Sequence, residues 1–319
     1  MFQETKAMFL YCTSPVHMGA GVAVGGLIDN PIQRERHTDY PMIAGSGLKG
    51  AVRHDFYAQP AGKDEDSLLD RIFGPNGSDY AGAISFSDAQ LVAFPVRCPR
   101  RAFVYATSPT ALARAARLLA QAGVPMDWAP EPEIEAGACR VRNSAVLADD
   151  QDDQRLHLEA YELKAKELRE SVNLDNTAGW LADNALPTDE AYRFFSAKLK
   201  SDLVLLSDDD FGYFVRNATV VEPHVRINDV SGTADEGGLF YTENLPPESL
   251  LISLIMASPE RSGKNERLSA SKVMGMVVKG DGDRLYGLHG RLIQVGGDAT
   301  TGRGQVVVNI VGGAGDADA

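Results

Sequence analysis

The sequence predicts an α+β protein with a ferredoxin-like core and large insertions. Three apolar runs, at residues 7–13, 250–257 and 305–311, have the composition of buried strands. Between them, apolar residues recur at helical spacing, most clearly from residue 108 to 123. The order strand, loop, helix, strand, helix and then further strands fits such a core, and no internal repeat is visible.

The first half of the chain supplies strands and two clear helices. Residues 7–13 predict the first strand, and Ser14-Pro15 ends it. A glycine-rich loop follows at 17–28. Ser46 is predicted to cap a helix that runs to about residue 58. The remaining predictions here are a turn at Phe73-Gly74, a strand within 81–88, and a helix that starts at Ser108-Pro109 and ends at Gly123.

The second half predicts an insertion followed by a return to strands. Residues 125–155 are rich in Pro, Asp and Glu and indicate a long loop or insertion, which we extend to about 125–205 within a single domain of residues 1–319. Residues 157–170 and 188–204 look helical, with a weakly structured stretch at 173–187 between them. The later predictions are a hairpin at about 220–245, a buried strand at 250–257, a helix at 265–276, and strands at 290–295 and 305–311.

Composition excludes several classes of protein. Hydrophobic residues make up 44% of 319, which suits a globular protein with a core. No window approaches 18 uninterrupted apolar residues, so no membrane span is expected, and the first residues do not read as a signal peptide. The three cysteines are far apart and without metal-binding spacing. This pattern predicts a cytoplasmic protein.

The net charge of −13 argues at first against a nucleic-acid partner. However, acidic residues concentrate at 149–153, at 208–210 and after residue 313, and we expect these runs to be solvated surface. Local charge along a groove decides affinity for a polyanion. Basic residues gather in pairs or triplets: Arg34/Arg36, Lys49/Arg53, Arg97/Arg100/Arg101, Arg140/Arg142 and Arg261/Lys264/Arg267.

The segment 45–53 resembles a phosphate cradle. Free N–H groups at a helix start favour an anion, and Lys49 and Arg53, one turn apart, would add cationic contacts. Its glycines lack Walker spacing, so nucleotide hydrolysis is not expected. An ordinary capped helix with surface cations is the alternative.

A second glycine cluster, at residues 296–304, carries Thr300, Thr301 and Arg303 between two predicted strands. Glycine-rich turns let a ligand's backbone approach closely, but a simple hairpin turn would look the same. Two such clusters with basic residues favour an extended polyanion over a small ligand.

Asp29 is the main catalytic candidate. It follows small and apolar residues and precedes two arginines. A carboxylate there could bind a divalent metal or orient a ribose 2′-hydroxyl for attack on the adjacent phosphate. The alternative is a turn aspartate before Asn30-Pro31. His17 and His37 are candidate acid/base partners, although a single histidine is often structural.

The combined motifs resemble the RAMP proteins of CRISPR effector complexes, most closely the backbone subunit of the type III-B (Cmr) complex. The string Pro-Ile-Gln-Arg-Glu-Arg-His-Thr, residues 31–38, is the most specific part. One departure is Gly47, where a second serine often stands, and the acidic balance is another. The other residues that carry the resemblance are 13–21, 29–30, 41–50 with Arg53, 73–74, 82–88, the 220–245 hairpin and 296–304.

The resemblance implies a modified RNA-recognition fold with a thumb hairpin at 220–245. It also implies copies that stack along a guide CRISPR RNA beside other Cmr subunits, each thumb displacing a nucleotide of the guide–target duplex. Asp29 would then support Mg²⁺- or Mn²⁺-dependent cleavage of the target RNA. The residues expected to bind RNA are His17, Arg34, Arg36, Gly45, Ser46, Gly47, Lys49, Arg53, Gly296, Gly297, Thr301 and Arg303.

Three other functions remain open on sequence grounds. The chain could be a non-catalytic structural RNA-binding subunit, or an endoribonuclease that processes the guide precursor through a histidine-centred site. A small-ligand enzyme is the third. The hairpin itself could be a plain surface hairpin instead of an interaction arm.

Overall fold

The computed structural model describes residues 2–21, 26–63, 68–77, 79–130, 132–148, 154–165 and 172–312. The acidic run at 149–153, the tail after residue 313 and parts of two predicted segments, the 17–28 loop and the 157–170 helix, lie outside the described residues. In the described part of the chain, none of the helices is long and apolar enough to span a bilayer.

Four strands form the centre of the main sheet, in the order β15–β1–β13–β4, and each pair is antiparallel. Helix α1 connects the first two core strands along the chain, and α7 connects the last two. This is the ferredoxin-like order, so the α+β prediction is confirmed. The bounds are β1 Glu4–Cys12, α1 Gly45–Tyr57, β4 Ala89–Cys98, β13 Leu250–Ala257, α7 Ala270–Val278 and β15 Gln305–Val311.

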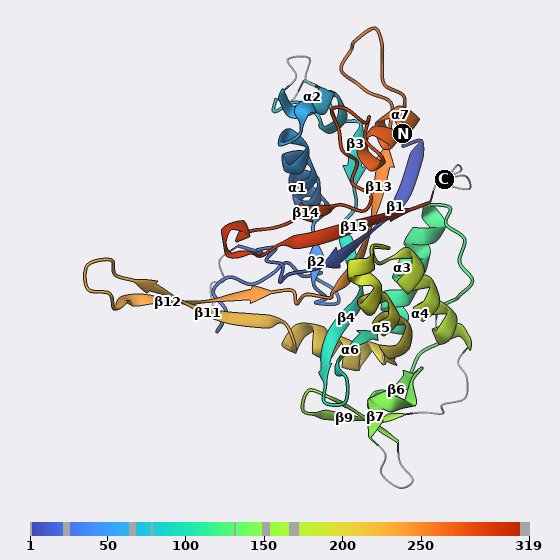
Figure 1. Cartoon of the computed structure of the whole chain (residues 1–319), viewed down its shortest axis with the longest axis vertical. Coiled ribbons are helices and arrows are strands. Elements are labelled where there is room, and N and C mark those ends of the chain that lie inside the picture. The colour runs from blue at the N-terminus through green and yellow to red at the C-terminus, as the bar shows by residue number, and fades with distance from the viewer. Residues whose placement is uncertain are drawn as a thin grey trace.

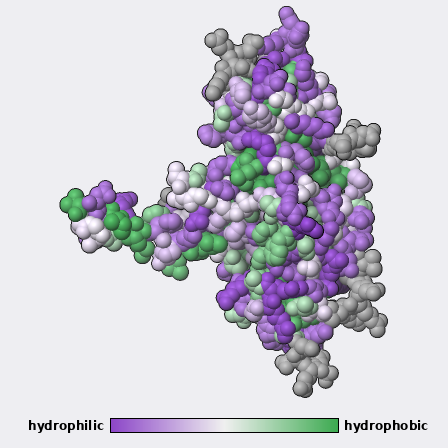
Figure 2. Space-filling view, viewed as in Figure 1, coloured by the Kyte–Doolittle hydropathy of each residue, from purple (hydrophilic) through white to green (hydrophobic). Residues whose placement is uncertain are grey.

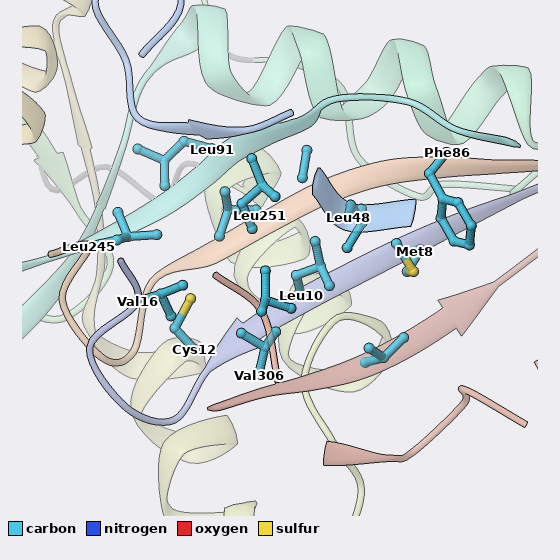
Figure 3. Close-up of a cluster of buried hydrophobic side chains, with 14 of the residues drawn as sticks. Met8, Leu10, Cys12, Val16, Leu48, Phe86, Leu91, Leu245, Leu251 and Val306 are labelled. Atoms are coloured by element: carbon cyan, nitrogen blue, oxygen red, sulfur yellow. The ribbon is translucent and has the colours of Figure 1, made fainter. Parts of the chain in front are cut away.

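Residues 7–12 of β1 are all apolar because both faces of this part of the strand are covered. Met8, Leu10 and Cys12 join the cluster that contains α1 and α7, as Figure 3 shows for one part of it. Phe9 and Tyr11 join a second cluster on the opposite face, built from α3 (Pro109–Gln121), α4 (Val172–Asn184) and α5 (Arg193–Asp202). A strand buried on two sides needs no polar alternation.

The insertion between β4 and β13 extends the sheet at one edge. Strand β5 pairs with β4, and the sheet continues through β10, β6, β9, β8 and β7. These strands are β5 Ala102–Thr107, β6 Ala138–Val141, β7 Leu147–Ala148, β8 Arg155–Leu158, β9 Tyr161–Ala165 and β10 Leu203–Leu206. The remaining elements are β2 Met42–Ile43, β3 Ile84–Phe86, β14 Leu292–Gln294, α2 Leu68–Phe73, α6 Asp208–Asn217, and the 3₁₀ turns η1 Pro60–Lys63, η2 Ser144–Val146, η3 Glu190–Tyr192 and η4 Ala299–Thr301.

Several local predictions within the insertion are wrong. The predicted helix at 157–170 is instead a pair of strands, β8 and β9, as far as residue 165, because β8 buries alternate residues. The stretch at 173–187 is helix α4, whose buried Leu174, Ala178 and Leu181 keep helical spacing among polar residues of low helix propensity. The predicted loop at 125–155 contains β6 and β7. The acidic run 208–210 opens α6, where negative charge favours a helix N-terminus.

The predicted hairpin is confirmed. Strands β11 (Val220–Ile227) and β12 (Ala234–Asn244) pair with each other in a separate two-stranded sheet and project from the body of the molecule (Figure 1), and the base of β12 also bonds the loop at residues 29–30. The space-filling view shows apolar side chains along this arm and at its tip (Figure 2). The most exposed are Val230, Ile227 and Leu239. Isolated two-stranded hairpins are marginal in water, so the connection of this one to the body matters.

Candidate nucleic-acid interface

Asp29 lies at the base of the hairpin. Its backbone N–H donates to the carbonyl oxygen of Tyr241 at 3.1 Å, and its Oδ2 accepts from the Tyr241 N–H at 2.7 Å. Asn30 and Thr242 form a bridge next to this pair. The carboxylate is exposed, and its Oδ1 has no hydrogen bond among the described residues. The hairpin therefore orients Asp29 and leaves one carboxylate oxygen facing solvent.

Glu243 ties the loop after Asp29 to the same strand. Its buried carboxylate accepts from Arg34 Nη2 at 2.5 Å, from the Ile32 N–H at 3.0 Å and from Thr219 Oγ1 at 2.8 Å. The Arg34 guanidinium also donates to the carbonyl oxygens of Asp39 and Val215. A buried carboxylate with a charged partner and two further donors is well satisfied. Arg34 is thus engaged inside the protein, and its predicted contact with RNA stays untested.

His17 packs against the hairpin base from the other side. The carbonyl oxygen of Glu243 lies 2.7 Å from His17 Nδ1, so Nδ1 carries the proton in this contact and Nε2 is left as the acceptor. Gly296 has a φ of 82°, and a Cβ there would lie 2.2 Å from the His17 carbonyl oxygen. The Gly297 N–H donates to that same oxygen at 2.9 Å. Gly296 therefore allows the loop to pack closely on His17, whereas a Cβ at Gly297 would make only ordinary contact at 3.6 Å.

His37 belongs to a different place. It is exposed, and its Nε2 lies 2.9 Å from Arg114 Nη2 and 3.8 Å from Glu35 Oε2. His17 is instead bound to the hairpin strand. No contact joins the two histidines among the described residues, and so the structure does not assemble them into an acid/base pair.

The start of α1 differs from the prediction in its cap. Ala44 is the N-cap, and the Gly45 N–H donates to Asp88 Oδ1 at 2.7 Å, so an aspartate from the β3–β4 turn satisfies the first donor. Ser46 lies inside the first turn and caps nothing, which corrects its predicted role. Ser46 and Gly47 are exposed, and their N–H groups have no partner among the described residues. Donors of this kind can hold a phosphate.

The cations predicted to bind RNA fall into two groups. Arg53 bonds Asp70, Asn76 and Tyr57, and Arg303 forms an ion pair with Glu222 of the hairpin. Lys49 and Arg36 make no hydrogen bond or ion pair within the part of the chain that is described. Partial burial and the neighbouring Arg53 lower the pKa of Lys49. A nearby anion would favour the charged form of Lys49, and Lys49, unlike Arg53, has no internal partner among the described residues, so it is the better-placed cation at the helix start.

Comparison with known proteins identifies the family. The model of the RAMP superfamily matches residues 9–307, nearly the whole chain. The chain belongs to the RAMP superfamily. It is 32% identical over 305 residues to the CRISPR system Cmr endoribonuclease Cmr4 of Pyrococcus furiosus, covering 94% of each chain.

Solved structures of RAMP proteins share this fold. The crystal structure of oligomeric Cmr4 from Pyrococcus furiosus matches with a TM-score of 0.69 and 26% identity, covering 98% of this chain and 99% of that one. A chain in the cryo-EM structure of the type III-B Cmr-beta complex bound to cognate target RNA matches with a TM-score of 0.67, covering 97% and 98%. At 17% identity this second likeness concerns the fold alone.

Sequence reasoning missed two residues of this RAMP protein, Tyr241 and Glu243. Tyr241 holds Asp29, and Glu243 holds Arg34 and His17. Both lie on β12, more than 200 residues from their partners along the chain. The run Thr242-Glu243-Asn244 is polar and stands just before a proline turn. Its sequence is that of a surface strand, and only the structure shows that these three residues are buried.

The residues around Asp29 limit how a metal could be held. The described residues contain no group of three or more His, Cys, Asp or Glu side chains that could hold a metal ion. Mg²⁺ commonly keeps several waters and binds through one or two carboxylates together with substrate phosphates. Asp29, with one carboxylate oxygen free of hydrogen bonds among the described residues, fits that mode. Phosphates of the bound RNA and water would supply the remaining ligands.

Proposed function

We propose that this chain is the RNA-binding backbone subunit of a cytoplasmic type III-B effector complex and that it cleaves bound target RNA at regular intervals. Copies of the chain would stack along a guide CRISPR RNA beside other Cmr subunits. The identity of 32% to a Cmr endoribonuclease over nearly the full length supports this. The absence of a described contact between His17 and His37 favours it over guide-precursor processing.

The observation that carries the proposal is the attachment of Asp29 to the hairpin base. An arm that inserts between nucleotides would unstack the target RNA next to its own base, where Asp29 lies. In-line attack needs the 2′-oxygen opposite the leaving 5′-oxygen, which a regular A-form helix prevents. Fixing a carboxylate where the strand is distorted contributes through orientation.

In the proposed reaction, the ribose 2′-oxygen attacks the adjacent phosphorus and the bond from phosphorus to the 5′-oxygen breaks. Asp29 orients the 2′-hydroxyl and accepts its proton, and the leaving 5′-oxygen takes a proton from water, which gives a 2′,3′-cyclic phosphate and a 5′-hydroxyl end. A divalent cation, when bound, would neutralise charge on the phosphate. Its protein ligand would be Asp29.

The guide strand is assigned to the start of α1. The free N–H groups of Ser46 and Gly47 would bind a phosphate, and Lys49 would add a positive charge. Arg36 is the other candidate cation without an internal partner among the described residues. The glycine loop at 296–304 packs on His17, which in turn bonds the hairpin base.

The test is target cleavage by complex reconstituted with Asp29→Asn. Asparagine keeps an oxygen for the Tyr241 N–H, so the loop should stay in place while the base is lost. We expect cutting at every site to slow by at least about 100-fold, the size typical of losing a general base. Complex size on gel filtration should not change. Asp283→Asn, an exposed aspartate elsewhere, is the control.

Normal cutting by the Asp29→Asn complex would overturn the catalytic assignment. Metal dependence needs a separate experiment. Chelation with EDTA should stop cleavage, and Mg²⁺ or Mn²⁺ should restore it. Cleavage that persists in EDTA would remove the metal from the proposal while leaving the role of Asp29 intact.

A further inference from the structure

A second basic site lies away from the candidate interface. A hollow of about 340 Å³ opens between α5 and the turn that joins β4 to β5. Helix α5 packs on the face of the core sheet opposite α1 and α7. The side chains used in the argument below are Arg100, Arg101, Phe194, Lys198, Ser201 and Asp202.

The floor of the hollow is a fixed polar cluster. Lys198 and Asp202 are 8% and 3% exposed, and their Nζ and Oδ2 atoms are 2.7 Å apart. Lys198 Nζ also donates to the Arg101 carbonyl oxygen at 3.1 Å. Ser201 Oγ donates to Asp202 Oδ1 at 2.8 Å. Asp202 is ion-paired with both Lys198 and Arg101, and its single negative charge stands against the positive charges of Lys198, Arg100 and Arg101, so the hollow is positively charged.

Arg101 has a donor that the protein does not satisfy. Its Nε is buried and has no hydrogen bond, because the nearest carboxylate oxygen, Asp202 Oδ1, is 3.6 Å away. A buried donor without a partner is costly. Arg100, the preceding residue, is exposed and makes no side-chain bond among the described residues. The Arg101 Nε itself is closed to a ligand, but the side chain is 37% exposed, so an anion in the hollow would pair with the accessible part of this guanidinium group and with that of Arg100.

An aromatic ring stands beside these arginines. Phe194 is 68% exposed, and its ring is held edge-to-face against Phe195 with 5.4 Å between centroids. A single exposed ring is ordinary on a protein surface, so the relevant feature of Phe194 is its position beside two arginines in one hollow. Stacking on aromatic side chains next to a basic surface is the usual way in which unpaired bases are bound.

We propose that this hollow binds one nucleotide of single-stranded RNA, with its phosphate between Arg100 and Arg101 and its base on Phe194. The volume suits a single nucleotide. A partner protein's carboxylate could pair with the arginines but would leave Phe194 uncovered, so RNA is the better fit. The site goes beyond the proposed function because it lies outside the Asp29 region and requires no cleavage.

The test is ultraviolet crosslinking of a short oligouridine to the full-length chain, with the crosslinked peptides mapped by mass spectrometry. We expect crosslinks within α5, separate from those near Lys49. Arg100→Glu should lower the α5 crosslinks at least about fivefold and leave the Lys49 crosslinks unchanged. Arg97→Glu, an exposed arginine on the same strand pair that does not line the hollow, should change neither.

Binding measurements separate the base from the phosphate. In a chain that also carries Lys49→Ala, Phe194→Ala should weaken oligouridine binding by about tenfold, in the range for losing one stacked base. Arg193→Ala, the exposed neighbour on α5, is the matched control. AMP is tested as a competitor at a concentration equal to that of the RNA nucleotides. If it competes as well as RNA does, the hollow binds free nucleotides and not a strand.

Three results would overturn the proposal. One is the absence of crosslinks in α5, and another is an equal loss with Arg97→Glu. The third is competition by inorganic phosphate or by oligoglutamate as effective as that by RNA, because either would show that the base makes no contribution. Loss of cleavage with Asp29→Asn bears on none of these outcomes.

Discussion

The hairpin base and the start of α1 are built in opposite ways. At the hairpin base, Asp29 accepts a hydrogen bond from Tyr241, and Arg34 forms a largely buried ion pair with Glu243. At the start of α1, the N–H groups of Ser46 and Gly47 and the ammonium group of Lys49 have no partners among the described residues. A reacting group must be held in place, whereas a site for a polyanion must keep its donors free. The contrast matches the two roles proposed for them.

The largest effect is expected at the buried pair of the hairpin base. Glu243→Ala leaves Arg34 largely buried without its counter-ion, which costs 3–5 kcal/mol at fully buried pairs. Because the Arg34 side chain is 17% exposed, we expect about 3 kcal/mol. Urea unfolding measures it. Glu222→Ala, which breaks the more exposed pair with Arg303, should cost at most about 1 kcal/mol. Equal losses would contradict the distinction.

The two glycines of the helix start should differ next. A Cβ at Gly45 would lie 2.4 Å from the Phe86 carbonyl oxygen, so Gly45→Ala must move backbone and should cost roughly 1–3 kcal/mol. A Cβ at Gly47 meets nothing within 4 Å. Gly47→Ala should therefore leave the free energy of unfolding unchanged or slightly higher. Thermal unfolding of both variants checks this. Equal melting temperatures for both variants and the unchanged protein would show that α1 does not pack as closely on the Phe86 carbonyl oxygen as the structure indicates.

The cations of the helix start predict a smaller effect on RNA binding. Lys49→Ala together with Arg53→Ala should weaken guide binding and reduce its dependence on salt. Lys49→Ala alone should account for most of this, lowering the slope of log K against log salt by roughly 0.7–0.9 for one lost phosphate contact. Arg53→Ala should do less, because its guanidinium already bonds Asp70 and Asn76. An unchanged slope in a filter-binding titration of the double variant would contradict the assignment.

The smallest effect concerns pH at the hairpin base. Burial raises the pKa of Glu248, which follows β12, to about 7, and its Oε2 has no partner among the described residues. The folded state thus binds this proton more tightly than the unfolded state, so the contribution of Glu248 to stability is greatest below about pH 4.5 and falls as pH rises towards 7. Glu248→Gln should flatten this part of a stability–pH curve. Glu236→Gln, on the exposed part of β12, should not.

Local patterns were sufficient for a large part of the fold. Strand 250–257 is predicted at its observed bounds, and α3 starts at Ser108-Pro109 as predicted, where the Ser108 Oγ accepts from the Ala111 N–H. Within the insertion they were insufficient. Polar residues of low helix propensity hide the helical spacing of α4, and β8 is stable only because the sheet edge supplies its partners.

Local sequence is enough to show which groups are available: Asp29, the glycine-flanked start of α1, and a hairpin arm. Their surroundings come from the fold. It placed Asp29 against Tyr241, 212 residues away, and enclosed Arg34 against Glu243, 209 residues away. It also left Lys49 without a partner among the described residues while it paired Arg53 and Arg303 internally. Periodicity reflects neighbours along the chain, and these pairings depend on strand register between distant segments, which no local pattern encodes.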